Sequence, residues 1–182
     1  MSRWTKGELL GLLGLAILLV ALPVMAQPPA WHQVTCSDGG FSVMAPGTPV
    51  VKTRRFELKT SANAYGVLAR KEYIMKGDGC VFRVSYCDLP DDLLQSGGPA
   101  HILGVIADAR LRRVRSEPVS RSGISLGPHE GLDVVHRLTN GVTLNLRMYL
   151  VGNRCYELMV AQRNPRPAVV SRFMDSFKLL GK

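Results

Sequence analysis

One short motif in the sequence could place a nucleophile. Gly123-Ile124-Ser125-Leu126-Gly127 has the G-x-S-x-G pattern, and Asp133 and His136 follow it in the chain order of a nucleophile-elbow hydrolase. That chemistry requires the serine on a sharp turn between a strand and a helix, with its hydroxyl beside a base. Here Pro128 and a further expected strand follow the motif, so the required context is absent. We therefore expect a glycine-bounded strand and turn, and keep hydrolysis by Ser125 as an alternative.

Two histidines and two acids after this motif have side chains that could bind a metal. They are His129, Glu130, Asp133 and His136. Their spacing is not H-E-x-x-H, and on a strand His129 and His136 have opposite parity and point to opposite faces. A loop between them would be needed to bring them together. We expect no metal and no cofactor, and keep a metal or small-ligand carrier as a further alternative.

Four arginines concentrate positive charge in a short segment: Arg110, Arg112, Arg113 and Arg115. They fall at the end of an expected helix, where cations complement the negative end of the helix dipole. A solvated helix end is the simpler interpretation, since charge runs are usually solvated faces. The functional interpretation is a docking patch for an acidic partner or an anionic surface, to which Lys52, Arg54 and Arg55 could add.

The first 26 residues have the features of a secretory signal peptide. Arg3 and Lys6 precede an apolar run, and Val24-Met25-Ala26 offers small or neutral residues where a signal peptidase reads. An uncleaved membrane anchor is the alternative, because the apolar run is at the short edge of a bilayer span. Cleavage after Ala26 would leave 156 residues, enough for one domain, and would lower the formal net charge from +9 to +8. We expect a periplasmic or secreted protein that binds no nucleic acid and contacts a membrane only if residues 1–26 remain attached.

All four cysteines follow the expected cleavage site: Cys36, Cys80, Cys87 and Cys155. An even number in an exported chain favours two disulfides, for which three connectivities exist. Cys87 and Cys155 are expected on the same side of one sheet. The preferred pairing is therefore Cys87–Cys155 with Cys36–Cys80, and free buried thiols are the alternative.

The segment 142–180 has the most regular pattern in the chain. Residues 142–151 alternate apolar and polar side chains, Gly152-Asn153 interrupts the run, and 156–160 resume it. This pattern predicts an antiparallel hairpin. Asn164-Pro165 then begins a helix whose apolar side we expect to lie on the sheet.

The register of this hairpin has two solutions. A two-residue turn would put Leu146 beside Met159. A three-residue loop would put Leu146 beside Leu158 and Leu144 beside Val160, which creates one continuous apolar face. We prefer the second register for that reason.

The rest of the chain predicts an α+β protein. Residues 102–115 have the apolar spacing of an amphipathic helix, and 27–38, with Trp31, read as a polar lead on the surface. The strands are connected mainly as hairpins, so we expect an antiparallel sheet of about six or seven strands with two main helices packed on it, in a single domain at 27–182. Besides the hairpin, strands are expected at 41–45, 50–58, 65–75, 80–87, 119–126 and 132–138.

Three groups of residues resemble motifs of PsbP/Mog-like domains, in particular those of bacterial PsbP-related exported proteins. The resemblance covers roughly residues 38–180. The motifs are Gly40-Phe41-Ser42-Val43 followed by Pro46, Phe82-Arg83-Val84-Ser85-Tyr86 followed by Asp88-Leu89-Pro90, and Tyr149-Leu150-Val151-Gly152-Asn153-Arg154 with Tyr156, Arg172-Phe173 and Ser176-Phe177.

The resemblance implies an α/β/α sandwich that serves as a non-catalytic binding or assembly module. Plant and cyanobacterial members associate with photosystem II, and the Mog branch binds a small GTPase. Neither partner carries over, because no residues here match those interaction or metal sites. The cysteines also depart from the usual pattern. Our expectation is an exported, non-enzymatic interaction module that binds an envelope protein or an anionic surface.

Overall fold

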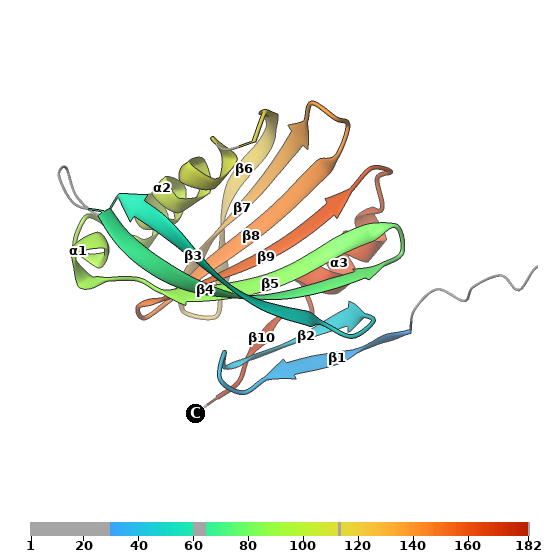
Figure 1. Ribbon diagram of the computed structural model, residues 1–182, viewed down its shortest axis with the longest axis horizontal. Coiled ribbons are helices and arrows are strands. Elements are labelled where there is room, and N and C mark those ends of the chain that lie inside the picture. The colour runs from blue at the N-terminus through green and yellow to red at the C-terminus, as the bar shows by residue number, and fades with distance from the viewer. Residues whose placement is uncertain (1–29, 60–64, 113, 182) are drawn as a thin grey trace, which may run out of the picture.

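The computed structural model describes residues 30–59, 65–112 and 114–181 (Figure 1). The expected signal peptide at 1–26 lies outside these residues. Within them, no helix is long and apolar enough to cross a membrane. The helices are α1 (Asp91–Leu94), α2 (Pro99–Leu111) and α3 (Pro167–Met174). The strands are β1 (Trp31–Cys36), β2 (Phe41–Pro46), β3 (Val50–Lys59), β4 (Tyr65–Gly77), β5 (Cys80–Asp88), β6 (Ser116–Leu126), β7 (His129–Leu138), β8 (Thr143–Val151), β9 (Arg154–Gln162) and β10 (Lys178–Leu179).

Seven strands form one curved antiparallel sheet in the order β3-β4-β5-β9-β8-β7-β6. The expected antiparallel sheet is therefore confirmed. Among the described connections, short turns join β4 to β5, β6 to β7, β7 to β8 and β8 to β9. Helices α1 and α2 connect β5 to β6, and β9 pairs with β5. Alternate residues of a strand point to opposite faces, and both faces of the central strands are buried.

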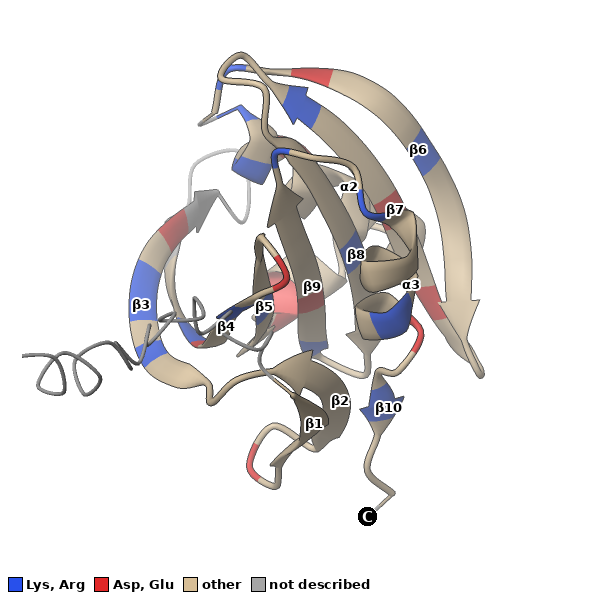
Figure 2. Ribbon diagram, turned by 90° about the vertical axis from the view of Figure 1, so that its right-hand side faces the viewer, with Lys and Arg blue, Asp and Glu red and all other residues tan. Residues whose placement is uncertain are grey.

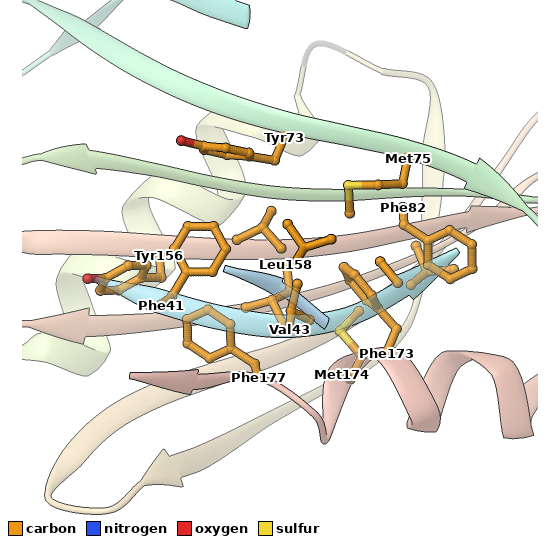
Figure 3. Packing of buried hydrophobic residues seen from close by; sticks show 14 of the residues in the cluster. Phe41, Val43, Tyr73, Met75, Phe82, Tyr156, Leu158, Phe173, Met174 and Phe177 are labelled. Atoms are coloured by element: carbon orange, nitrogen blue, oxygen red, sulfur yellow. The ribbon is translucent and has the colours of Figure 1, made fainter. Parts of the chain in front are cut away.

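The first core lies on the sheet face that carries Phe82, Leu158 and Tyr156 (Figure 3). It is closed by the second, three-stranded sheet β1-β2-β10 and by α3. Phe41 of β2 and Phe173 of α3 are both completely buried. The stacked and edge-to-face aromatic rings at this interface contribute specific geometry beyond the apolar area that they remove from water.

The second core lies on the opposite face of the seven-stranded sheet, beneath α1 and α2. Ile102, Leu103 and Ile106 of α2 pack against apolar side chains of β7 and β8. Two cores thus share one sheet. The two-helix α/β/α sandwich is too simple a description, because a small sheet helps α3 to cover the other face.

The register preferred for the last hairpin is wrong. The structure pairs Val151 with Arg154 and Leu146 with Met159, as a two-residue turn requires. Gly152 takes the positive φ of 60° that this type II′ turn needs at its first central position. The regularly spaced apolar residues of β8 and those of β9 lie on opposite faces of the sheet, because each strand contributes to both cores. One continuous apolar face is therefore unnecessary.

The interpretation of residues 27–38 as a surface lead is also wrong for the part that the structure describes. Residues 31–36 form β1, with Val34 and Cys36 buried. Trp31 packs edge-to-face on Phe82 at 5.4 Å between ring centroids, and its indole Nε1 donates a hydrogen bond of 2.6 Å to Asp78. β1 and β10, which has only two residues, add strands to the expected count.

Candidate functional site

The groups of the G-x-S-x-G motif are not assembled for catalysis. Ser125 is exposed on β6 and lies opposite Glu130 of β7. His136 lies opposite Pro118, seven residues further along β6, which is about 23 Å of strand. Its Nδ1 instead lies 3.0 Å from the Ser116 hydroxyl. The motif is thus a strand end followed by a turn, as its sequence context predicts.

The candidate metal ligands are similarly dispersed. His129 and His136 lie on the continuous strand β7 with opposite parity, as expected. Asp133 forms an ion pair of 2.9 Å with Arg147, and burial together with the nearby Arg121 charge lowers the pKa of His136. In the part of the chain that the structure describes, no group of three or more His, Cys, Asp or Glu side chains could hold a metal.

The four sequence-predicted arginines divide into different environments. α2 ends at Leu111, so only Arg110 lies within the helix, and its guanidinium turns toward the sheet and pairs with Glu157 of β9. Arg112 and Arg115 are exposed. Arg113 lies outside the described residues.

The exposed Arg112 and Arg115 have neighbours from segments that are distant in the sequence. Thr139, after β7, donates its backbone N–H to the Arg115 carbonyl. Arg163, after β9, donates to the carbonyl of Asn140 in the β7–β8 turn at 3.1 Å. We call this region the arginine-rich end of the sheet and define it by five exposed arginines that precede β6, lie near the end of β7 or follow β9: Arg112, Arg115, Arg137, Arg163 and Arg166. Figure 2 colours the backbone of Lys and Arg residues blue.

Among the described residues, the charge of the arginine-rich end is only partly compensated. Glu117 lies directly opposite Arg137 in the β6–β7 pair. Val114, 39% exposed, and Val119, 57% exposed, lie in the segment that follows α2 and in β6. Guanidinium groups beside exposed apolar side chains can form forked hydrogen bonds to carboxylates or phosphates and also contribute contact area.

The cysteine pairing is not supported. All four cysteines are buried, and no pair among them is at disulfide distance. Cys87 and Cys155 do lie opposite each other on one side of the sheet, as expected. Cys36–Cys80 is wrong because Cys36 lies next to Tyr86 across Gly39, and Tyr86 is six residues, about 20 Å, along β5 from Cys80.

A polar cluster that the sequence analysis missed surrounds Asp38 in the β1–β2 turn. Its carboxylate accepts hydrogen bonds from the Cys36 thiol at 2.9 Å and the Tyr86 hydroxyl at 3.1 Å, and it pairs with Lys71. The Cys36 and Lys71 contacts hold the pKa of Asp38 well below its usual range. Burial and Asp38 raise the pKa of the Cys36 thiol, so it is not an activated nucleophile. The cluster anchors the turn; only the Ser-Asp-Gly-Gly composition of residues 37–40 hints at it.

Comparison with solved structures supports the predicted fold, whereas the comparisons of sequence found no match. No protein-family model matches the chain, and no curated protein matches it. The solution structure of the cyanobacterial PsbP protein CyanoP from Synechocystis sp. PCC 6803 is similar, with a TM-score of 0.52 and 12% identity over 82% of this chain and 92% of that chain. A Pseudomonas aeruginosa protein of unknown function, PA94, is similar at a TM-score of 0.40 and 12% identity over 77% of this chain and 85% of its own. The chain therefore has a PsbP-like fold, as the sequence motifs predict.

Proposed function

We propose that this protein is an exported, non-catalytic interaction module that docks through its arginine-rich end onto an anionic partner in the cell envelope. The observation that carries the proposal is that five exposed arginines lie at one end of the sheet: Arg112 and Arg115 before β6, Arg137 in β7, and Arg163 and Arg166 after β9. The antiparallel topology brings the start of β6, the end of β7 and the end of β9 to the same end of the sheet. A positive patch of this kind speeds association with an acidic partner and selects against basic ones.

The PsbP-like fold and the dispersed Ser125, Asp133 and His136 favour binding over catalysis. The signal-peptide pattern of residues 1–26 favours export. The formal net charge of +8 that remains without residues 1–26 favours an anionic partner, which is either an acidic envelope protein or an anionic envelope surface.

The test is capture of partners from an envelope extract by the chain lacking residues 1–26, at low and at moderate salt. The variant Arg112→Ser/Arg115→Ser/Arg137→Ser removes three charges from the arginine-rich end. The matched control, Lys52→Ser/Arg55→Ser/Lys178→Ser, removes three exposed charges from β3 and β10. We expect a partner that is lost with the first variant, kept with the second and weakened by salt.

A parallel arm replaces the extract with vesicles that contain anionic lipid. Binding of vesicles, with the same dependence on the arginines, would assign an anionic surface in place of a protein. Equal loss in both variants, retention in both, or no binding in either arm would contradict docking through this end.

A further inference from the structure

The helix-covered face of the sheet contains a buried ionic network. Glu72 of β4 and Glu157 of β9 are only 1% and 4% exposed, and Ser85 of β5 lies between them in register with both. Arg54 and Arg70 pair with Glu72, Arg110 pairs with Glu157, and Arg83 lies between the two carboxylates. This network joins β3, β4, β5, β9 and α2.

The network has more positive than negative charge. Four guanidinium groups pair with two buried carboxylates, but the side chain of Arg54 is 60% exposed. The three less exposed arginines therefore leave an excess of one positive charge away from solvent. Arg70 is 8% exposed, and the Nε atoms of Arg70 and Arg83 find no acceptor among the described residues. Glu72 Oε1 and Ser85 Oγ in the same network likewise have no hydrogen-bond partner there. Burying charge and hydrogen-bonding groups without partners is unfavourable, so an anion at this position would be stabilised.

An apolar cavity of about 240 Å³ adjoins the unbalanced arginines. Phe56 of β3 and Ile106 and Ala109 of α2 supply apolar walls, and Arg70 and Arg110 lie at its polar side. Arg70 also stacks over Phe56, with its guanidinium carbon 5.2 Å from the ring centroid. A second cavity of about 210 Å³ shares Arg110 and Val114 with the first and extends toward Leu144 and Met159.

One acidic side chain borders the cavity. Glu57 is exposed at its edge and makes no ion pair within the described ranges, whereas the arginines lie deeper. The polar side of the cavity therefore favours an anion over a cation. The apolar walls favour a hydrocarbon chain over a fully polar anion.

We propose that the cleft between α2 and strands β3–β5 binds a single-chain anionic amphiphile, with its acidic head at Arg70 and Arg110 and its chain against Phe56, Ile106 and Ala109. A methylene group occupies roughly the 30 Å³ of a water molecule, so the first cavity holds about eight carbons of a chain. The end of a longer chain would extend into the second cavity. This ligand site adjoins the arginine-rich end at Val114 but does not depend on the docking function proposed for that end.

Decanoate is a suitable probe, with decanol and decyltrimethylammonium as matched probes that lack the negative charge. Binding to the chain without residues 1–26 is measured by titration calorimetry and by backbone amide shifts. We expect decanoate to bind at least tenfold more tightly than either matched probe, with shifts concentrated on β3, β4 and the end of α2. Equal binding of all three, or no binding of decanoate, would overturn the proposal.

Two variants locate the site without removing any member of the ionic network. Ala109→Leu fills part of the cavity, and Ala100→Leu makes the same change at an exposed position in the first turn of α2. Val114→Glu puts a carboxylate at the junction of the two cavities, and Val119→Glu is its control on β6. We expect Ala109→Leu and Val114→Glu to weaken decanoate binding at least tenfold and the controls to leave it unchanged. If Ala109→Leu and Val114→Glu bind decanoate as tightly as their controls do, decanoate binds elsewhere and the proposal is wrong.

Discussion

Arg110 on α2 and Glu157 on β9 form an ion pair that ties the helix to the sheet. Glu157 is 4% exposed and also pairs with Arg83, so its carboxylate is held by two guanidinium groups in a largely water-free position. Arg110, which the sequence pattern predicted at a solvated helix end, therefore has a structural role. Among the described residues, Arg112, Arg115 and Arg137 at that end are exposed and make no ion pair.

The stability of the protein should depend on this carboxylate. Glu157→Gln leaves the charges of Arg83 and Arg110 without their acidic partner in a buried position. We expect a loss of about 3 kcal/mol in the free energy of unfolding, measured by urea denaturation. Asp108→Asn is the control, since its pair with Arg121 is about half exposed and should contribute less than about 1 kcal/mol. Similar effects of the two changes would show that the network adds no stability.

Replacing Gly131 by alanine should destabilise the protein, whereas the same change at Gly123 should not. A Cβ on Gly131 of β7 would lie 2.6 Å from the carbonyl oxygen of Met148, which is backbone and cannot move aside. Gly131→Ala should therefore destabilise the protein by about 1–3 kcal/mol in urea denaturation. A Cβ on Gly123, in β6, would contact nothing within 4 Å, and Gly123→Ala should change the free energy of unfolding by less than about 0.5 kcal/mol. A tolerated alanine at Gly131 would contradict the packing of β7 against β8.

The Asp38 cluster should make stability depend on pH. The pKa of Asp38 in the folded protein is below its ordinary value, chiefly because the Cys36 thiol and Lys71 donate hydrogen bonds to it. The folded state therefore gains stability from ionised Asp38 above about pH 4 and loses it as the pH falls below that value. We expect Asp38→Asn to lower the melting temperature at pH 7 and the difference from the wild type to shrink toward pH 3. A difference that is constant over this range would argue against the cluster.

The four thiols should be unreactive in the folded protein. Burial raises the pKa of Cys87 to about 12 and the pKa of Cys155 well above its ordinary value, and thiolates are the reactive form. A thiol reagent at pH 8 should label the native chain slowly and, after denaturation without a reductant, label four cysteines per chain. A sample treated with reductant first gives the reference count. Fewer than four labels in the unreduced sample would reveal a disulfide.

The sequence predicts the sheet well because its strands alternate and end at recognisable turns. It misassigns the final hairpin because the register depends on which faces are covered. Leu146 faces the core beneath α2, whereas Leu158 of the neighbouring strand faces the core of Phe41 and Phe173. Alternation cannot show that both faces are buried, since the covering strand β1 reads as a polar segment.

Which residues come together in the candidate sites depends on the topology of the sheet even more than the hairpin register does. Alternation places Cys87 and Cys155 on one side of the sheet but gives no position along it, so it could not exclude Cys36–Cys80. Arg137 and Arg163 join Arg115 only because β7 and β9 end at the same end of the sheet. Glu72 and Glu157 are 85 residues apart in sequence, and no local pattern links them.

The most direct test of docking through the arginine-rich end is the salt dependence of binding to the captured partner or anionic vesicle. Affinity is measured at about 50 mM and about 200 mM salt, a range over which screening of exposed charges changes strongly. We predict that the wild-type chain and the Lys52→Ser/Arg55→Ser/Lys178→Ser control lose affinity steeply with salt. The Arg112→Ser/Arg115→Ser/Arg137→Ser variant should bind weakly at low salt and respond little to added salt. An unchanged affinity and salt response in this variant would contradict the account.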